Sequence, residues 1–365
     1  MVRRVAAVIE QCWHRVPGGT ATSTIRSLGA IERSGKFRVM GLAARHSAPA
    51  PIEDQIEFPV VASRLPRFAL YESWHRFRRP ALRPMIGDVD VVHATGGVIP
   101  PAGRRPLAVT VHDLAFLRTP QHFTERGVRF MTRSFEIARD EAAAIIVPSR
   151  QTADDCLAHG IEQARLRVVP WGVYVAAVSE SDRARVKHAY NLPRQFALWV
   201  GTAEPRKNLR GLLDAHRLVQ DRLPLVMAGP VGWGADQAEV LASAAPSARH
   251  IGRVAEPDLA VLYDLATVFV YPSLWEGFGM PVLEAMAQAT PVISTRDSPM
   301  DDVAGEAGVM IDATDTEALS EALLSVVSDP DPWLIRSQSA RRRAESATWD
   351  RTGHAIVDVY GEICR

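Results

Sequence analysis

The chain has 365 residues, enough for two ordinary domains, and its 47% hydrophobic and 23% charged residues are typical of a globular protein. Its 42 basic and 42 acidic side chains cancel, which excludes a global positive field that would attract nucleic acid. The three cysteines, Cys12, Cys156 and Cys364, lie far apart and form no Cys-x-x-Cys pair, which excludes a disulfide framework and a structural zinc site and predicts a cytoplasmic protein.

The first residues include two arginines, as in a signal peptide, but the apolar run that follows is too short for one. It extends from Val5 to Ile9 and ends at Glu10. No other stretch approaches the roughly 20 apolar residues that a membrane-spanning helix needs. We therefore expect a protein that is neither exported nor inserted across a membrane.

The amino-terminal half alternates short apolar runs with helical patterns. Such runs, rich in β-branched residues, are typical of parallel strands that are buried on both faces. The predicted strands are residues 5–9, 37–43, 89–93, 107–112, 144–147 and 166–169, and the predicted helices are residues 21–33 and 124–141. This alternation predicts a doubly wound, Rossmann-like α/β domain.

A glycine pair follows the first predicted strand. Gly18 and Gly19 precede Thr20, which we expect to cap the next helix. Glycines let a ligand approach the backbone closely at the carboxyl edge of a sheet, so the pair is a candidate binding loop. A plain turn explains the same pair equally well.

Residues 64–83 interrupt the alternation with a basic and aromatic segment. They hold six arginines against one glutamate, Glu72, a balance of 6 − 1 = +5, with aromatic residues between them. That mixture is typical of a helix that binds an anionic membrane surface. Pro66, Pro80 and Pro84 confine any helix to the middle of the segment. Peripheral membrane contact is one hypothesis, and a solvated helix with an aromatic inner face is the other.

Asp88-Val-Asp90 has the spacing of two carboxylates that can chelate a divalent metal. The pair opens a predicted buried strand, however, and Gly87 before it is typical of a turn. We therefore expect no metal site at these two residues.

The predicted strand of residues 107–112 ends in the pair His112-Asp113. A histidine at the carboxyl end of a strand lies where open α/β sheets bind ligands. No third metal ligand stands near it in the sequence, so a metal is not expected. The alternative is a structural histidine whose nitrogens are satisfied within the fold.

The chain divides near Ala176, where the composition turns polar. Shortly before that point Ser149 is expected to cap a helix. We predict an amino-terminal domain of residues 1–175, a second domain of residues 176–348 and a terminal helix of residues 349–365.

The second half repeats the pattern of the first. Its predicted strands are residues 197–200, 225–228, 250–251, 268–271, 292–293 and 309–311, and from Thr316 the chain is expected to be helical. A second Rossmann-like domain follows. The Gly232-Trp-Gly234 loop lacks the third glycine of a dinucleotide fingerprint, because position 237 is glutamine, so a nicotinamide cofactor is not expected.

Two adjacent cations, Arg206 and Lys207, follow the first strand of this half in the run Glu-Pro-Arg-Lys-Asn-Leu. At the start of a helix they suit a diphosphate, since arginine is a planar fork and lysine a point charge. The chain has only three lysines against 42 − 3 = 39 arginines. A lysine at this position therefore indicates that the site favours a compact ammonium group over a guanidinium. An ordinary charged helix start is the alternative.

The most informative stretch is a strand, a glycine loop and a helix, from residue 268 to residue 289. Gly277 and Gly279 permit positive φ angles, and a loop of this kind directs backbone N–H groups at one point. The helix N-terminus adds about half a positive charge, which favours a phosphate. Glu276 and Glu284 flank the loop, and carboxylates beside an anion suit hydroxyl groups, as in a sugar nucleotide. Solvent-facing glutamates are the alternative.

The spacing of Glu276 and Glu284, with seven residues between them and Gly-Phe-Gly-Met-Pro inside, resembles the hallmark of the retaining glycosyltransferases of family 4, also called group 1. The run from Glu204 to Leu209 resembles the diphosphate site of that family. The segments around His112 and Val254 resemble those that face the donor sugar and the nucleotide base.

The resemblance implies the GT-B fold, in which two Rossmann-like doubly wound domains face a cleft and the terminal helix crosses back to the first domain. Together with the glycine pair Gly18-Gly19, which is selected from its place at the sheet edge alone, it gives two sets of expected site residues. The catalytic residues are Glu276 and His112, and the donor-binding residues are Gly18, Gly19, Arg206, Lys207, Val254, Gly277, Phe278, Gly279, Met280 and Glu284.

The implied reaction moves a sugar, with retention and without a metal or cofactor, from a nucleotide-sugar donor to a hydroxyl acceptor. The segment around His112 favours GDP-mannose as the donor, and a glycan, a lipid-linked sugar or a small molecule is the expected acceptor. Arg206, Lys207 and the amides of residues 278–280 would stabilise the leaving diphosphate.

Three alternatives accompany this interpretation. A retaining glycosidase would need its carboxylates about 5 Å apart on one bond and has no use for the cations, so it is disfavoured. A nucleotide-sugar 2-epimerase on the same fold, and a subunit that binds a sugar nucleotide without transferring it, stay open.

Overall fold

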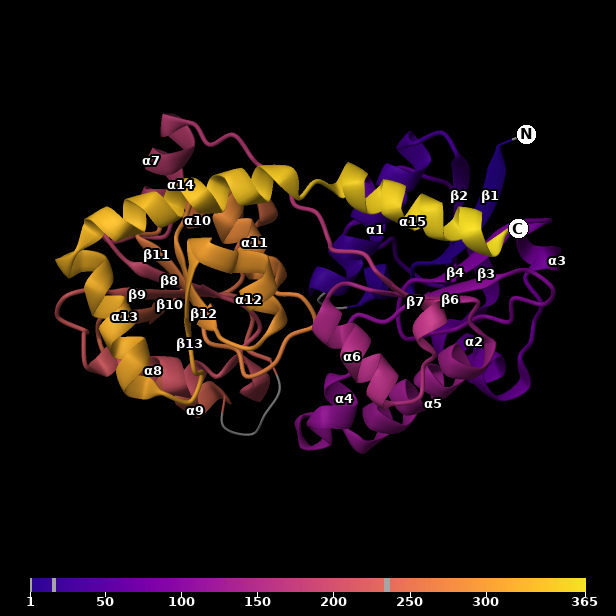
Figure 1. Cartoon of the computed structure of the whole chain (residues 1–365), viewed down its shortest axis with the longest axis horizontal. Coiled ribbons are helices and arrows are strands. Elements are labelled where there is room, and N and C mark those ends of the chain that lie inside the picture. Colours follow the sequence, from indigo (N-terminus) through magenta and orange to yellow (C-terminus); the bar gives the residue numbers. More distant parts are fainter. Residues whose placement is uncertain (1, 15–17, 233–236) are drawn as a thin grey trace. The chain divides into compact units, whose positions relative to one another are not determined.

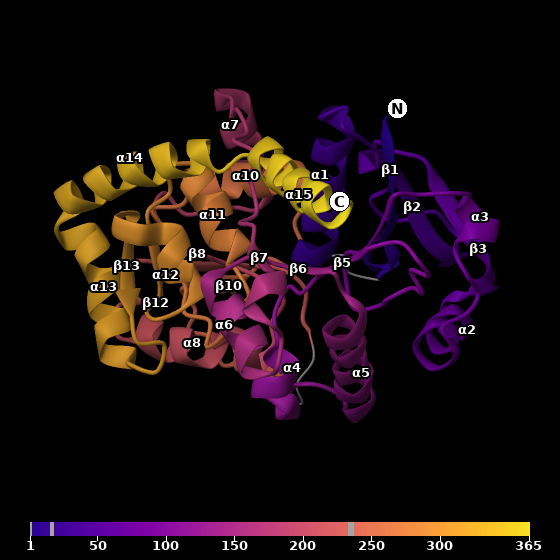
Figure 2. The ribbon, with the colours of Figure 1, turned by 45° about the vertical axis from the view of Figure 1, so that its right-hand side comes forward.

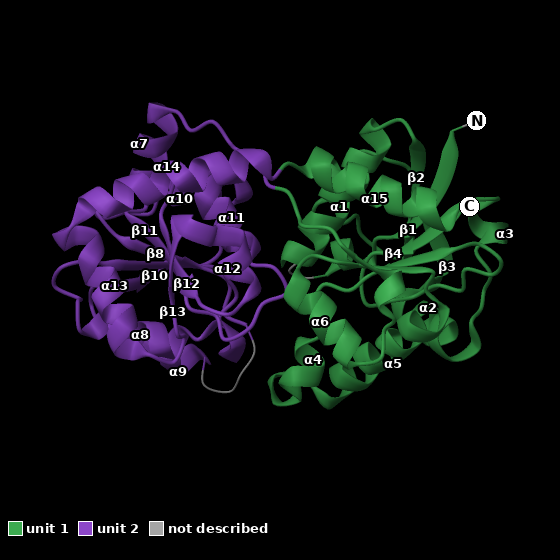
Figure 3. Cartoon of the chain, viewed as in Figure 1, with its two compact units in different colours: residues 1–172, 348–365 green, residues 173–347 purple. Residues whose placement is uncertain are grey.

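The computed structural model describes residues 2–14, 18–232 and 237–365 (Figure 1). Two compact units make up the chain (Figure 3). Unit 1 contains residues 1–172 and 348–365, and unit 2 contains residues 173–347. The last 18 residues therefore belong to the same unit as the first 172. Gly234, part of the Gly232-Trp-Gly234 loop, lies outside the described residues.

Unit 1 is built on a seven-stranded sheet in which every described pair is parallel. The strands are β1 (Arg3–Val8), β2 (Phe37–Arg45), β3 (Val60–Pro66), β4 (Val91–Ala94), β5 (Leu107–Thr110), β6 (Ala144–Val147) and β7 (Leu166–Val168). Their order is β3-β2-β1-β4-β5-β6-β7, so the winding reverses between β1 and β4. Ligands of doubly wound sheets bind beside such a reversal, at the carboxyl ends of the strands.

The helices of unit 1 cover both faces of its sheet. They are α1 (Gly18–Arg33), α2 (Arg67–Glu72), the π-helix η3 (Ser73–Phe77), α3 (Arg83–Ile86), α4 (Ala115–Arg118), α5 (Glu125–Glu141), α6 (Arg150–Ala158) and α15 (Trp349–Ile363). Ala6 and Val8 of β1 face a core shared with Trp74 of η3 and Phe135 of α5. On the opposite face α15 packs along α1, as Figure 2 shows.

Unit 2 repeats this design with a six-stranded parallel sheet. Its strands are β8 (Ala197–Val200), β9 (Leu225–Ala228), β10 (Ala248–His250), β11 (Val268–Tyr271), β12 (Val292–Thr295) and β13 (Gly308–Ile311). The order β10-β9-β8-β11-β12-β13 reverses between β8 and β11. The predicted fold class, two Rossmann-like doubly wound domains, is confirmed.

Eight α-helices are described in unit 2. They are α7 (Glu180–Ala189), α8 (Leu209–Arg217), α9 (Gln237–Ala242), α10 (Glu256–Leu265), α11 (Met280–Ala287), α12 (Pro299–Ala304), α13 (Thr316–Ser328) and α14 (Pro330–Ser346). The helical prediction from Thr316 onward is confirmed. None of the helices described in either unit is long and apolar enough to span a bilayer.

Three local predictions need correction. Strand β3 was not predicted, because it is an edge strand whose side chains alternate between exposed and buried and include Ser63 and Arg64. Thr20 is not a cap, since α1 already begins at Gly18 and Thr20 lies in its first turn. The strand predicted at residues 250–251 lies earlier, at Ala248–His250. Ser149 does cap α6, and its hydroxyl accepts a hydrogen bond from the N–H of Thr152.

Candidate donor site

The predicted anion-binding residues meet at the reversal point of the unit 2 sheet. The loop after β8 contains Arg206 and Lys207, and the loop after the neighbouring strand β11 contains Glu276. The backbone N–H of Leu274 donates to the carbonyl of Arg206 at 2.9 Å, which joins the two loops directly. Residues that are 69 positions apart in sequence are thereby brought into contact.

Glu276 forms ion pairs with both cations. Its Oε2 lies 2.7 Å from a guanidinium nitrogen of Arg206, and its Oε1 lies 2.5 Å from Nζ of Lys207. The three side chains are mostly shielded from solvent, with exposed fractions of 10% for Glu276, 10% for Lys207 and 18% for Arg206. Water screens such pairs weakly, so each charge depends strongly on its partners.

Tyr271 completes this cluster and is not among the site residues predicted from the sequence. It is the last residue of β11 and is fully buried. Its hydroxyl donates to Oε1 of Glu276 at 3.0 Å and accepts from Nζ of Lys207. A hydroxyl at the carboxyl end of a strand, five residues before the glutamate, was the signal available in the sequence. Because it contacts both charged groups, Tyr271 fixes Lys207 against Glu276.

Glu204 is a second carboxylate behind the cluster. It is 2% exposed, and its Oε1 accepts from Arg206 at 2.6 Å. Arg206 also donates to the carbonyl of Trp275 at 2.8 Å. These contacts orient the guanidinium from two sides. The sequence motif Glu-Pro-Arg-Lys-Asn-Leu contains Glu204 but does not by itself predict this role for it.

The charges of the cluster set the protonation state of Glu276. Burial alone would raise the pKa of this carboxyl, but Arg206 and Lys207 outweigh burial and hold its pKa at about 2. Burial and the nearby Arg206 lower the pKa of Lys207, whereas Glu276 acts to raise it. Glu276 is therefore ionised at neutral pH and is the anion that keeps two adjacent buried cations compatible.

The glycine loop leads from Glu276 into α11. Gly279 has φ of +97°, which favours glycine, and a Cβ at this position would lie 2.5 Å from Cγ of Met300. Phe278 is buried, and Met280 is the first residue of α11, with Pro281 in its first turn. Gly277, Phe278, Gly279 and Met280 thus form the turn that positions the amino end of this helix.

Glu284 lies one turn into α11, and its Oε2 accepts from the hydroxyl of Tyr263 in α10 at 3.1 Å. Burial, opposed by this hydrogen bond and assisted by Glu256, raises the pKa of Glu284 to about 7. The two glutamates of the motif therefore differ in charge state, because cations surround only Glu276.

Val254 follows β10, two strands away from β8 at the edge of the sheet. It is half-buried in the connection to α10. Gly252 before it has φ of +75° and open space at its Cβ position, and its carbonyl accepts from the N–H of Gly229 at 2.8 Å.

The other predicted residues lie in unit 1, at the carboxyl ends of β1 and β5. Gly18 begins α1 with φ of +62° and open space at its Cβ position, and Gly19 follows it as an exposed residue. His112 follows β5, and its Nε2 lies 2.9 Å from the carbonyl oxygen of Thr95. Gln11, after β1, donates to the same carbonyl and to the Thr95 hydroxyl.

The contact of His112 with Thr95 defines its tautomer. A carbonyl oxygen only accepts, so Nε2 must carry the proton and Nδ1 presents a lone pair. Burial lowers the pKa of His112, against the opposing influence of Thr95 and Asp113. A neutral imidazole with an acceptor nitrogen suits a hydroxyl group as its ligand.

The two aspartates of Asp88-Val-Asp90 are engaged with other groups. Asp90 accepts from the N–H of Arg4 at 2.7 Å, and Asp88 forms ion pairs with Arg83 and Arg105. Both precede β4 and lie at the amino end of the sheet. Within the described ranges, no group of three or more His, Cys, Asp or Glu side chains could hold a metal ion.

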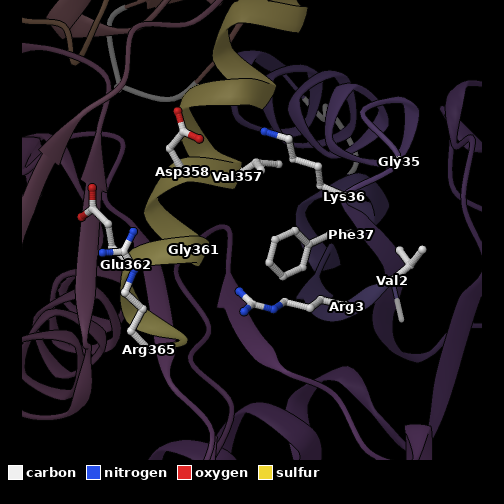
Figure 4. Close-up of a pocket in the computed structure, with 10 residues that line it drawn as sticks. All are labelled: Val2, Arg3, Gly35, Lys36, Phe37, Val357, Asp358, Gly361, Glu362 and Arg365. Atoms are coloured by element: carbon white, nitrogen blue, oxygen red, sulfur yellow. The ribbon is translucent and has the colours of Figure 1, made fainter.

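Unit 1 also has an open pocket of about 730 Å³ (Figure 4). Arg3, Lys36 and Phe37 line it together with Asp358 and Arg365 of the carboxyl-terminal segment. It therefore lies at the amino ends of β1 and β2, the opposite edge from the predicted binding residues. None of the sequence-predicted site residues lines it.

Comparisons with known proteins agree with the fold and the motifs. A family model described as glycosyl transferases group 1 matches residues 180–347, and one described as glycosyltransferase family 4 matches residues 17–177. The O-antigen chain mannosyltransferase B of Escherichia coli is 32% identical over 266 residues, which are 69% of each chain. A serotype-specific mannosyltransferase of Escherichia coli is 31% identical over 197 residues, 49% of this chain but 23% of that protein, so this chain spans about a quarter of it.

The solved structure of HepE from Anabaena, in complex with UDP and glucose, has a TM-score of 0.78 and is 16% identical, with 98% of this chain and 99% of that chain covered. The fold is thus that of the GT-B glycosyltransferases. The chain belongs to glycosyltransferase family 4, also called group 1.

Proposed function

We propose that this glycosyltransferase transfers a hexose, with retention of anomeric configuration, from a nucleotide sugar to a hydroxyl acceptor. The observation that carries the proposal is the buried cluster of Arg206, Lys207 and Glu276 beside the glycine loop. Two adjacent cations and a helix amino end can bind a diphosphate, and carboxylates beside them can accept from sugar hydroxyls.

Donor binding would exchange the partners of this cluster. The diphosphate takes the place of Glu276 as the anion facing Arg206 and Lys207, and the Glu276 carboxylate becomes available to the hydroxyls of the transferred sugar. Glu284, in its ionised form, would accept hydrogen bonds from the ribose. The acceptor nitrogen of His112 suits another sugar hydroxyl. That His112 contacts the donor sugar is a prediction.

The chemistry follows from where charge develops. The bond between the anomeric carbon and the diphosphate oxygen breaks, the acceptor oxygen bonds to that carbon, and negative charge grows on the diphosphate. Arg206, Lys207 and the amides of residues 278–280 would stabilise it, each charged hydrogen bond contributing roughly 1.5–3 kcal/mol. The acceptor proton would pass to a departing phosphate oxygen. We propose that these groups act without a metal ion.

Two observations support a donor assignment. Relatives of this chain are named mannosyltransferases, which supports mannose, and hence GDP-mannose, as the donor. The structural neighbour HepE was solved with UDP and glucose, which supports a nucleotide sugar in general. We propose a glycan, lipid-linked or small-molecule hydroxyl as the acceptor, and a cytoplasmic location.

The donor and the reaction type can be tested together. A thermal-shift screen of GDP, UDP and dTDP sugars should give the largest stabilisation with GDP-mannose. The same mixtures, incubated and separated, distinguish the alternatives: slow donor hydrolysis supports a transferase and an epimeric product the 2-epimerase. Binding without any turnover, even with acceptors present, would favour the inert subunit.

The diphosphate assignment has a matched control. Lys207→Ala should weaken nucleoside diphosphate binding by about tenfold or more, because it removes a buried charged partner. Lys187→Ala removes an exposed lysine of α7 and should leave affinity unchanged. Equal affinity of the two variants would refute the assignment.

The metal proposal has its own test. Activity should persist in excess EDTA. Loss of activity with EDTA, restored by a divalent cation, would contradict the proposal and make Asp88 and Asp90 candidate metal ligands.

A further inference from the structure

We propose that one face of unit 1 binds the surface of an anionic lipid bilayer. We call it the basic aromatic face and define it by Arg64, Phe68, Arg76, Phe77, Arg79 and Arg126, all of them exposed. This inference goes beyond the donor site and does not depend on it.

The face is built on one short helical segment. α2 and η3 run without interruption from Arg67 to Phe77, between Pro66 and Pro80 as the sequence predicted. Leu70 and Trp74 lie four residues apart and are buried in the core of unit 1. Phe68 and Arg76 lie on the opposite side of the helical segment, eight residues apart, and Phe77 adjoins them. The amphipathic pattern therefore leaves a mixed aromatic and basic side to solvent.

The six arginines of residues 64–83 separate into two groups in the structure. Three of them form ion pairs within unit 1. Arg67 lies 3.6 Å from Glu10, Arg78 pairs with Glu141, and Arg83 lies 3.1 Å from Asp88. Arg64, Arg76 and Arg79 are exposed, and no carboxylate of the described residues lies within ion-pair distance of them. Their charges remain available to an external anion.

Two phenylalanines lie among these charges. Phe68 is 60% exposed and Phe77 is 67% exposed, although rings of this size are usually buried. The guanidinium of Arg126, from α5, lies 4.7 Å from the centre of the Phe68 ring, and that of Arg76 lies 5.9 Å from the Phe77 ring. Each exposed ring therefore has a cation beside it.

The face rests on a firm support. Tyr71 and His75, on the inner side of the segment, stack on Phe130 of α5 with ring centres 5.5 Å and 4.7 Å apart. Arg78 donates to the carbonyls of Ile99 and Pro100 and closes the end of the segment. The arginines and phenylalanines are therefore presented by an ordered scaffold.

This chemistry fits a bilayer better than a nucleic acid. A phenylalanine has no polar group to leave unpaired and gains by entering the headgroup region, while the arginines face lipid phosphates. Nucleic acid would be bound mainly through its phosphates, for which the exposed rings contribute little apart from stacking on unpaired bases. An anionic bilayer uses both kinds of side chain on the same face.

The test uses the full chain and vesicles in a flotation assay. The protein should float with vesicles of equal parts phosphatidylcholine and phosphatidylglycerol, less so as salt rises, and not with phosphatidylcholine alone. A variant with Arg64→Glu, Arg76→Glu and Arg79→Glu should bind at least about tenfold more weakly, since each arginine near an anionic surface contributes about fivefold. A variant with Phe68→Ser and Phe77→Ser should also bind vesicles more weakly, and less of it should remain bound at high salt.

A matched control reverses three exposed arginines of unit 2, with Arg194→Glu, Arg222→Glu and Arg342→Glu. It has the same net charge as the first variant and should bind vesicles like the wild type. All variants should retain the wild-type affinity for nucleoside diphosphate, which shows that they are folded. Failure of the wild type to float with anionic vesicles, equal binding by both triple variants, or tighter binding to single-stranded nucleic acid than to vesicles would overturn the proposal.

Discussion

At the scale of single residues, the proposed function gives Glu276 two roles that compete. In the unliganded protein it neutralises Arg206 and Lys207, and in the proposed reaction it must leave them for a sugar hydroxyl. In the proposed reaction an incoming diphosphate would therefore displace an anion that is already present. The binding free energy of a nucleoside diphosphate would then be the difference between its own interaction with the two cations and that of the Glu276 carboxylate. Its affinity would be lower than if the cations had no such partner.

This competition gives a prediction whose sign is opposite to that expected for an ordinary ligand-binding residue. Glu276→Gln should bind nucleoside diphosphate more tightly, by about tenfold or 1.4 kcal/mol, because the competing charge is gone. Sugar transfer should fall by at least about a hundredfold, since the carboxylate that faces the donor sugar is lost. Calorimetric titration with GDP and UDP, beside a transfer assay, measures both effects.

The same variant has a stability signature that serves as its control. Without ligand, Lys207 would lose its paired carboxylate and Arg206 would keep only Glu204, so the melting temperature should fall. Saturating diphosphate should raise the melting temperature of Glu276→Gln by more than it raises that of the wild type. Weaker diphosphate binding by Glu276→Gln, with an unchanged melting temperature, would contradict the competition.

Glu284 predicts a pH dependence of donor binding. Its pKa is about 7 in the unliganded protein because it is buried, and the proposed contact with ribose hydroxyls requires the ionised form. Below pH 7 binding must release a proton, so the dissociation constant should rise as pH falls, by at most about tenfold per pH unit. Above pH 7 it should be flat. Glu276, with its pKa of about 2, stays ionised across this range and does not contribute.

Glu284→Gln should bind the donor more weakly at pH 8 and should lose the dependence on pH. Glu321→Gln, at an exposed position of α13, is the matched control and should keep the wild-type profile. Calorimetric titrations from pH 5.5 to pH 8 would measure both, over a range of about one and a half units on the acidic side of this pKa. A profile that survives in Glu284→Gln would assign the proton to another group.

At the scale of elements, the sequence predicted best what is decided locally. Buried strands such as β6 and β11 are continuous apolar runs, and their predicted bounds agree with the structure. Edge strand β3 lacks such a run, because half of its side chains face solvent. Its existence depends on pairing with β2, which no local pattern encodes.

The site divides in the same way. Arg206, Lys207 and Glu276 were selected because each lies in a loop whose local pattern indicates anion binding. For Tyr271 the local pattern predicts only a strand, since its contacts arise from the pairing of β8 with β11 across the reversal of the sheet. Which strands become neighbours is a property of the whole sheet. The sequence of one segment therefore does not predict the contacts that its side chains make with the loop of a neighbouring strand.

The turn before α11 gives a prediction for one backbone position. Gly279→Ala should lower the melting temperature by several degrees and weaken diphosphate binding, because a left-handed φ costs an L-residue about 1–2 kcal/mol and the new Cβ would lie 2.5 Å from Met300. Gly361→Ala in α15 is the control, since nothing lies within 4 Å of its Cβ position. Alanine there should leave binding unchanged and slightly favour the helix. Similar behaviour of the two variants would show that the turn is not conformationally demanding.

At the scale of the whole molecule, unit 1 is assembled from both ends of the chain. Gly353 of α15 packs so closely on α1 that a Cβ would lie 2.6 Å from Cβ of Ala30. Tyr360 reaches the sheet, where its hydroxyl is 2.6 Å from Nδ1 of the buried His93 and its ring meets Phe37 edge-on at 5.1 Å. The segment between, residues 173–347, forms unit 2. The stability of unit 1 thus depends on residues that follow the whole of unit 2.

Tyr360→Phe tests this dependence with the removal of one oxygen atom. The pKa of His93 is lowered to about 3 by burial, so the ring is neutral and needs partners for both nitrogens, which Tyr360 and Thr110 supply. Leaving one nitrogen unsatisfied should cost about 1–3 kcal/mol and lower the melting temperature of unit 1 by several degrees. Tyr174→Phe, at a side chain that is 49% exposed, should change it little. Nucleoside diphosphate affinity should be the same in both variants, because the proposed donor contacts lie in unit 2, and a loss of that affinity in Tyr360→Phe would show that α15 supports the donor site as well as unit 1.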